Sequence, residues 1–160
     1  MYDRELEIAV SAVREAARLT RAVQDEIVAA RGQVAKDDRS PVTIADLAVQ
    51  ILVSHRLATA FPDDPLLAEE DSRPLLGKPA LAEQVFALAG RQLPAVGRNE
   101  MLSALDRGGH LGGRRGRFWI LDPVDGTKGF LRREQYAIAL ALVEAGRVSA
   151  AVLGCPTLPD

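Results

Sequence analysis

The residues best suited to chemistry lie in one hexapeptide that follows a short apolar run, Asp122-Pro123-Val124-Asp125-Gly126-Thr127. The three-residue spacing of Asp122 and Asp125 lets their carboxylates converge, and Gly126 allows the backbone to approach a ligand closely. Mg²⁺ takes oxygen ligands and is commonly held by one or two carboxylates together with a substrate phosphate. If a helix begins after Asp125, the amides of Gly126 and Thr127 also point at an incoming anion. The motif is therefore typical of a corner where metal and phosphate meet, with a plain Asp-Gly turn as the alternative for the hexapeptide alone.

Further carboxylates occur at two other places in the chain. The acidic run 69–71 comes directly after the apolar segment 65–68, and Asp46 lies one turn after Thr43, which can cap a helix. Taken singly, the run is typical of a solvated surface, and Asp46 of a favourable first turn of a helix. Carboxylates that pack within a few Å repel one another, and a bound divalent cation removes that repulsion. Their occurrence together with Asp122 and Asp125 therefore indicates a shared cation site.

The elements that must position these side chains form a mixed pattern of helices and strands. Apolar residues at three- and four-residue intervals predict helices, and short apolar runs bounded by turn residues predict strands. We expect helices at 3–30, 43–60, 80–89 and 99–105, strands at 65–68, 118–121, 136–143 and 148–153, and an exposed Gly-rich loop at 107–117. Asp122-Pro123 should stop the strand at 118–121, because proline withholds an N–H from the ladder. The last two strands are close enough in sequence to form a hairpin.

Composition restricts the classes of protein to which these residues can belong. The chain has 160 residues, of which 48% are hydrophobic and 26% are charged, and this suits one globular domain or half of a larger one. Its net charge of -2 argues against a nucleic-acid partner, because phosphate backbones are bound by a surplus of Lys and Arg. No apolar run in the chain approaches the roughly 20 residues of a membrane span, and the charged N-terminus is unlike a signal peptide. The lone Cys155 cannot form an internal disulfide. We therefore expect a cytoplasmic protein with no membrane partner.

Three segments, in this order, resemble the inositol monophosphatase superfamily of Mg²⁺-dependent, lithium-sensitive phosphatases: Ser40-Pro41-Val42-Thr43-Ile44-Ala45-Asp46, Ala68-Glu69-Glu70-Asp71, and Trp119-Ile120-Leu121 followed by the hexapeptide. The continuation at 128–137 and the ending at 153–156 look most like the 3′(2′),5′-bisphosphate nucleotidase branch of that family. Two positions depart from the family pattern. Ala68 stands where Gly commonly precedes the first Glu, and Arg133 stands where the nucleotidases usually carry Gly.

The resemblance implies a layered αβαβα sugar-phosphatase-like fold of the α+β class. Residues 1–160 would form its N-terminal, metal-binding part, built from helices and antiparallel sheet. The family fold takes a further Asp ligand from its C-terminal part, in a motif resembling Trp-Asp-x-Ala-Ala, and this motif is absent from the sequence. We therefore expect the isolated chain to bind one divalent ion with little or no turnover. The uncovered apolar strand at 148–153 predicts self-association as a homo-oligomer.

The resemblance also implies a role for each acid. The implied site residues are Glu69, Asp122, Asp125 and the Val124 carbonyl as metal ligands, Asp46 and Thr127 as the groups that position water, Gly126 and Thr127 as phosphate contacts, and Glu70 as support behind the ligands. Two or three Mg²⁺ ions are implied, with Asp122 shared between two of them, and Mn²⁺ could substitute.

The implied activity is hydrolysis of the 3′-phosphate of 3′-phosphoadenosine 5′-phosphate, by a metal-activated water, to give AMP and phosphate. Inositol phosphates and sugar bisphosphates are the alternative small phosphorylated substrates. A function of another class also stays open at this point, in which the chain is an inactive metal-binding or assembly half-domain.

Overall fold

Helices and strands both contribute to the core, as expected for an α+β protein. The computed structural model describes residues 2–30 and 41–158. Within these ranges it contains the helices α1 (Asp3–Ala30), α2 (Pro41–Ala60), α3 (Pro79–Gly90), α4 (Arg98–Asp106) and α5 (Thr127–Arg132), the short 3-10 helix η1 (Arg73–Leu75), and the strands β1 (Leu66–Leu67), β2 (Arg117–Asp125), β3 (Ala137–Glu144) and β4 (Arg147–Gly154). The predicted α+β class is confirmed. The predicted first, third and fourth helices, the strand at 65–68 and the hairpin agree with the structure to within one residue at each end.

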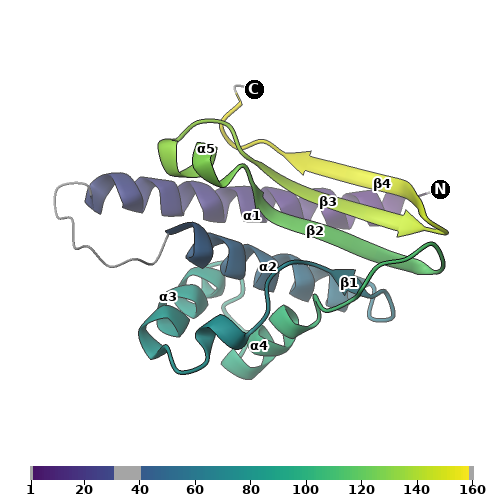
Figure 1. Cartoon of the computed structure of the whole chain (residues 1–160), viewed down its shortest axis with the longest axis horizontal. Coiled ribbons are helices and arrows are strands. Elements are labelled where there is room, and N and C mark those ends of the chain that lie inside the picture. The colour runs from purple at the N-terminus through teal and green to yellow at the C-terminus, as the bar shows by residue number, and fades with distance from the viewer. Residues whose placement is uncertain (1, 31–40, 159–160) are drawn as a thin grey trace.

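The sheet has the order β1-β2-β3-β4, with β1 parallel to β2 and the other neighbours antiparallel. Helices α1 and α2 lie along one face of this sheet, and α3 and α4 pack beyond α2 (Figure 1). Trp119 pairs with Leu142 and Leu121 pairs with Leu140, so these four buried side chains point from the sheet toward the helices. The sequence alternation of β2 and β3 therefore places one face of the sheet in the core.

Helix α2 is the centre of the core. Its residues from Leu47 to Val53 are fully buried, including the polar Gln50. A helix that is apolar almost all round must be covered on all sides, and α2 lies between α1, the sheet and the α3–α4 pair. Because Asp46 directly precedes this buried stretch on α2, the helix holds that carboxylate on a rigid support.

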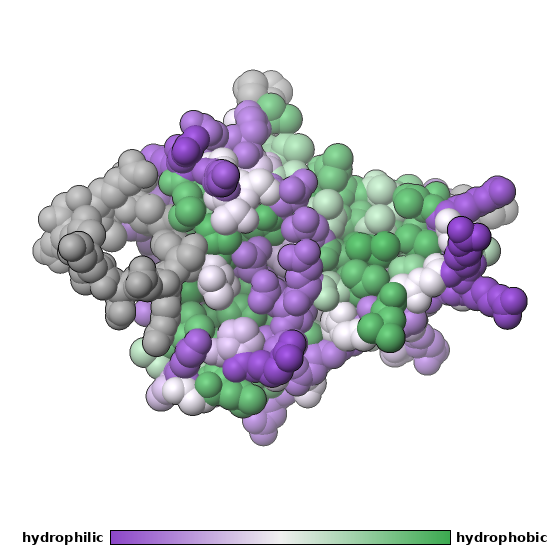
Figure 2. Space-filling model, in the orientation of Figure 1, coloured by the Kyte–Doolittle hydropathy of each residue, from purple (hydrophilic) through white to green (hydrophobic). Residues whose placement is uncertain are grey.

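The opposite face of the sheet carries small and apolar side chains. Ile120, Ala141 and Ala151 form one cross-strand row, and Asp122, Ala139 and Leu153 form the next. Figure 2 shows hydrophobic residues gathered over the strands on this side of the molecule. Leu153 is 68% exposed, and β4 is an edge strand of the sheet. The uncovered side of this strand that the sequence predicted is thus present, and it lies on the same face of the sheet as Asp122.

One arginine joins elements that are far apart in the sequence. Arg117, at the start of β2, donates hydrogen bonds to Asp64 before β1, Glu144 at the end of β3 and Glu5 in α1, at 2.9, 2.9 and 3.1 Å. Burial lowers the pKa of Arg117, but these hydrogen bonds outweigh burial and raise it. This cluster stabilises the end of the sheet that lies away from Asp122 and Asp125.

The prediction that Thr43 caps the second helix is wrong. Helix α2 begins at Pro41, so Thr43 is already within its first turn. The physical reason is that proline suits the start of a helix, where its fixed φ is helical and its missing N–H would have no partner. The residue before Pro41 lies outside the described residues.

The predicted loop at 107–117 is only partly an exposed loop. Most of 111–116 is exposed, but Gly108 is buried, and the segment around it pairs with β1. The Ala68 N–H donates to the Gly108 carbonyl at 2.9 Å, and the His110 N–H donates to the Leu66 carbonyl at 3.0 Å. Backbone pairing with the end of β1 therefore buried the start of a segment that glycine content alone marked as loop.

The prediction that Asp122-Pro123 stops the strand is also wrong. Strand β2 continues to Asp125, and its pairing with β3 shifts in register between Asp122 and Asp125. Asp122 pairs with Ala139 and Asp125 with Ala137, so two residues of β2 oppose Ile138 alone. Such a bulge tolerates proline, because its extra residue makes no ladder hydrogen bond.

Candidate metal centre and active site

The bulge in β2 decides where the two carboxylates of the hexapeptide point. In a regular strand, residues three apart have side chains on opposite faces of the sheet. The bulge adds a residue, so Asp122 and Asp125 pair with Ala139 and Ala137, which are two apart in β3 and share one face. Asp122 is half-buried and Asp125 is exposed at the end of the strand. The predicted convergence of these two carboxylates therefore depends on the irregularity at Pro123.

The charge of Asp125 reaches Asp122. Burial raises the pKa of Asp122, and the negative charges of Asp125 and Glu69 raise it further, while a hydrogen bond from the Val124 backbone opposes the shift. Val124 itself is buried, with 4% of its surface exposed. Asp122 therefore lies between one acid of its own strand and one acid that follows β1.

Asp46 is the most perturbed acid of the site. Its pKa is raised to about 7, first by burial and then by the charges of Glu70, Asp122 and Glu69. The side chain is half-buried on α2. The structure thus brings acids from α2, the end of β1 and the end of β2 into electrostatic range of one another. The shared cation site that their joint occurrence indicated stays a prediction.

The acidic run follows β1 and lines a hollow of about 400 Å³ together with Arg73 and Pro74. Glu69 is exposed and Glu70 is half-buried. Burial raises the pKa of Glu70, and the charges of Glu69 and Asp71 add to this. The carboxylate of Asp71 forms an ion pair with Arg73. Glu69 and Glu70 are the acids of this run whose charges raise the pKa of Asp46.

The turn after Asp125 leads directly into α5. Gly126 has φ +94°, and a Cβ there would lie 3.3 Å from the Gln135 carbonyl oxygen and from the Tyr136 Cα. Glycine is favoured by both the left-handed conformation and the close approach. Thr127 is the first residue of α5 and is exposed. The conditional prediction of a helix after Asp125 is confirmed.

The donor set suits a hard divalent cation, although its side chains are not gathered in the conformation described. Among residues 2–30 and 41–158, no three His, Cys, Asp or Glu side chains lie close enough together to hold one metal ion. The acids nevertheless raise one another's pKa, which is the repulsion that a cation would relieve. All the donors are oxygen atoms, as Mg²⁺ and Mn²⁺ require. The residues therefore fit such an ion in their chemistry and their electrostatics.

Comparison with known proteins gives the family. The model of the inositol monophosphatase family matches residues 1–160. This chain belongs to the inositol monophosphatase family. A 3′(2′),5′-bisphosphate nucleotidase 2 of Candida albicans is 44% identical over 99% of this chain and 48% of its own length. The corresponding nucleotidases of Schizosaccharomyces pombe and Oryza sativa are 43% and 46% identical, over 99% and 98% of this chain and 48% and 47% of their own lengths.

The chain spans about half the length of the curated relatives that it matches. Among solved structures, inositol monophosphatase II of Staphylococcus aureus has a TM-score of 0.55 and 16% identity, covering 91% of this chain and 38% of that one. This likeness supports the fold of the inositol monophosphatase family. In the described residues, no helix combines the length and the apolar character needed to cross a membrane.

In this member of the inositol monophosphatase family, Gln50 contacts the candidate site although the sequence pattern did not single it out. It is fully buried on α2, one turn after Asp46, and it bonds to the backbone of Glu70. A polar side chain inside the apolar stretch from Leu47 to Val53, four residues after a candidate acid, was the available signal. Amides in buried positions need partners, so this position pointed to a specific contact.

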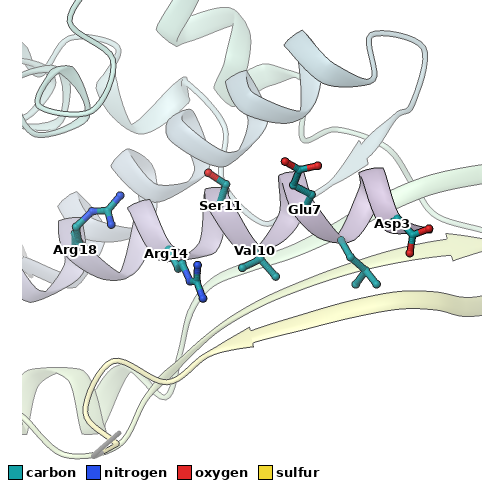
Figure 3. A pocket seen from close by; sticks show the side chains of 7 residues that line it. Asp3, Glu7, Val10, Ser11, Arg14 and Arg18 are labelled. Atoms are coloured by element: carbon teal, nitrogen blue, oxygen red, sulfur yellow. The ribbon is translucent and has the colours of Figure 1, made fainter. Parts of the chain in front are cut away.

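A second hollow, on α1, takes no part in this site. It has a volume of about 610 Å³, and its lining residues all belong to α1. Figure 3 shows Asp3, Glu7, Val10, Ser11, Arg14 and Arg18 along that helix. None of the predicted site residues lines this groove.

The departure at position 133 has a measurable structural cost. Arg133 follows α5 as its C-cap residue with φ +61°, in the left-handed region where glycine is favoured. Its ion pair with Asp25, at 3.3 Å, joins side chains that are 49% and 74% exposed and contributes little. We expect Arg133→Gly to raise the free energy of unfolding by about 0.5 to 1 kcal/mol, which is an increase of roughly 2 °C in melting temperature.

Arg132→Gly is the matched control for this prediction. Arg132 lies in the last turn of α5, in the helix itself, where glycine costs about 1 kcal/mol. The two variants should therefore shift the thermal transition in opposite directions. A melting temperature for Arg133→Gly at or below that of the wild type would contradict the strain assigned to this position.

Proposed function

We propose that the full-length protein is a Mg²⁺-dependent phosphatase that removes the 3′-phosphate of 3′-phosphoadenosine 5′-phosphate, and that residues 1–160 are its N-terminal, metal-binding part. The observation that carries this proposal is the bulge that places Asp122 and Asp125 on one face, with Asp122 within electrostatic range of Glu69 and Asp46. Relatives named 3′(2′),5′-bisphosphate nucleotidase, at 43 to 46% identity, support the choice of reaction.

In this proposal, Glu69, Asp122, Asp125 and the Val124 carbonyl hold two or three Mg²⁺ ions, for which Mn²⁺ could substitute. When bound, the ions supply Lewis-acid chemistry, lowering the pKa of water and offsetting charge on the departing oxygen. Glu70, which lies against α2 through its backbone, supports the ligands.

The chain's own groups then have distinct tasks. The carboxylate of Asp46, whose pKa is about 7 in the metal-free chain and lower beside bound cations, is then ionised near neutral pH and can accept a hydrogen bond from water. Together with the Thr127 hydroxyl, it orients that water toward phosphorus. The N–H groups of Gly126 and Thr127 begin a helix and donate to the phosphate oxygens. No covalent enzyme intermediate is needed, because water attacks in line with the leaving oxygen.

The substrate can be tested by a panel assay with the full-length protein. We expect kcat/KM for 3′-phosphoadenosine 5′-phosphate to exceed that for inositol 1-phosphate and fructose 1,6-bisphosphate, and we expect lithium to inhibit the reaction. Phosphate release measured for each substrate with Mg²⁺ present gives the ranking. A panel that ranks inositol 1-phosphate or the sugar bisphosphate first would replace the nucleotidase assignment, and no release from any of them would favour a non-enzymatic role.

Assembly through the sheet is the second candidate function, favoured by the exposed apolar face. Val148 and Leu153 on the edge strand β4 are 65% and 68% exposed. We expect the 160-residue chain to sediment as a species larger than a monomer, and Leu153→Lys to shift it toward the monomer, because a charge on an edge strand opposes pairing. Leu6→Lys, at an exposed leucine of α1, would be the surface control. A wild-type chain that sediments as a monomer at all concentrations would remove this candidate.

A further inference from the structure

Gln50 makes hydrogen bonds to both sides of one residue of the acidic run. Its Nε2 donates to the Glu70 carbonyl at 2.5 Å, and its Oε1 accepts from the Glu70 N–H at 3.0 Å. The same Nε2 donates to the carbonyl of Leu105, near the end of α4, at 3.0 Å. A side-chain amide that pairs with an N–H and a C=O of one residue imitates the ladder of a β-strand. Gln50 therefore continues the pairing of the chain beyond β1.

Gln50 and Gly108 together fix the backbone on both sides of Glu69. The N–H of Glu70 belongs to the peptide group that follows Glu69, and Gln50 holds it. The N–H of Ala68 belongs to the peptide group that precedes Ala68, and the Gly108 carbonyl holds it at 2.9 Å. The exposed side chain of Glu69 thus projects from a main chain that is anchored before and after it.

Gly108 shows how closely this anchor is packed. A Cβ at position 108 would lie 2.7 Å from Gln50 Nε2 and 3.1 Å from the Ala68 Cβ. Any side chain there would push the end of Gln50 away from Glu70. Gly108, which lies outside α2, therefore leaves the space that the side-chain amide of Gln50 occupies.

We propose that Gln50 is a positioning residue, which holds Glu69 at a fixed distance from Asp46 by clamping the Glu70 backbone to α2. Gln50 lies one turn after Asp46 on α2, so the helix that carries the water-orienting carboxylate also sets the place of the metal-ligand segment. The inference rests on the proposed function, because Glu69 is assigned there as a metal ligand. A ligand on an anchored backbone loses little conformational freedom when a cation binds, and this strengthens binding.

The test measures Mn²⁺ affinity of the 160-residue chain by calorimetry, with amide hydrogen exchange at Glu70 as the second readout. We expect Gln50→Leu to weaken Mn²⁺ binding by about 10- to 100-fold, as loss of a support behind a metal ligand does, and to speed exchange at the Glu70 amide. Gly108→Ala should do the same to a smaller degree, since its Cβ meets the flexible end of Gln50 first, at 2.7 Å, and the Ala68 Cβ and Leu105 carbonyl oxygen at 3.1 and 3.2 Å. It also decides the test if Gln50→Leu does not fold.

Thr20→Val is the matched control. Thr20 is fully buried and accepts a hydrogen bond from the Tyr136 hydroxyl at 2.8 Å, so its loss removes a buried polar contact without touching the acidic run. We expect its Mn²⁺ affinity to stay within about twofold of the wild type. Equal weakening in this control would show that affinity follows general destabilisation and would overturn the positioning role.

The remaining outcomes separate this inference from the proposed function. A wild-type chain that binds Mn²⁺ while Gln50→Leu and Gly108→Ala bind it equally well overturns the role of Gln50 and leaves the metal site standing. A wild-type chain that binds no Mn²⁺ overturns the metal site and the role of Gln50 together.

Discussion

Asp122→Asn should weaken Mg²⁺ or Mn²⁺ binding more than any other single amide substitution in the site, by at least on the order of 100-fold. Support residues behind a ligand already cost about 10- to 100-fold, and Asp122 is assigned as a ligand shared by two ions. The variant should fold, because crowding raises the pKa of Asp122 and a neutral amide relieves that repulsion. Calorimetric titration of Mn²⁺ into the purified chain gives the affinity.

The control for this variant is Asp63→Asn. Asp63 is an exposed acid that precedes β1, whereas the acidic run follows that strand. Its substitution should leave the affinity unchanged while changing the net charge equally. Equal affinities of Asp122→Asn and the wild type would show that the metal assignment is wrong, even if the chain binds the ion elsewhere.

Asp46→Asn and Thr127→Ala should each lower kcat of the full-length enzyme by on the order of 100-fold, with little change in metal affinity. These groups are assigned to orient water, so their loss raises the barrier of the chemical step and not the dissociation constant of the ion. Steady-state kinetics, measured beside Mn²⁺ titration, separate the two effects. A change confined to KM would assign the residues to substrate binding.

Asp46→Asn should also change stability in a direction that its role in catalysis does not predict. The pKa of Asp46 is raised from 3.8 to about 7, so in that pH interval the folded chain keeps a proton that the unfolded chain has released. Stability of the metal-free chain therefore falls as pH rises through the interval, and the ionised carboxylate is fully destabilising above it. Asparagine carries no such charge.

The expected result is a metal-free Asp46→Asn chain that melts at a higher temperature than the wild type at pH 8, with the difference shrinking toward pH 4. Thermal denaturation followed by circular dichroism across this range measures it. A variant that is less stable at pH 8 would mean that the carboxylate is favourably paired in the folded state, contrary to the crowding of acids around it.

Most of the secondary structure could be predicted, because it is written in short-range patterns. The apolar periodicity of 3–30 predicted α1, and the two apolar runs at 136–143 and 148–153 predicted the β3–β4 hairpin. Two of the errors fell where another segment supplied the partner, whereas the start of α2 was missed for a local reason, because Pro41 begins the helix before Thr43. Gly108 is buried because β1 pairs with its neighbours, and this pairing has no trace in the glycine content of the segment.

The sequence by itself determined which carboxylates are present, in which order, and next to which strands and helices. Only the tertiary structure decided that the acids of α2, β1 and β2 share one region, because their mutual effects on pKa depend on distances across the fold. It also decided that Asp122 and Asp125 share a face, through a bulge whose register is set by pairing with β3. The tertiary structure likewise decided that Gln50 clamps Glu70, because a buried amide can find its partner only after α2, α4 and the end of β1 have packed together.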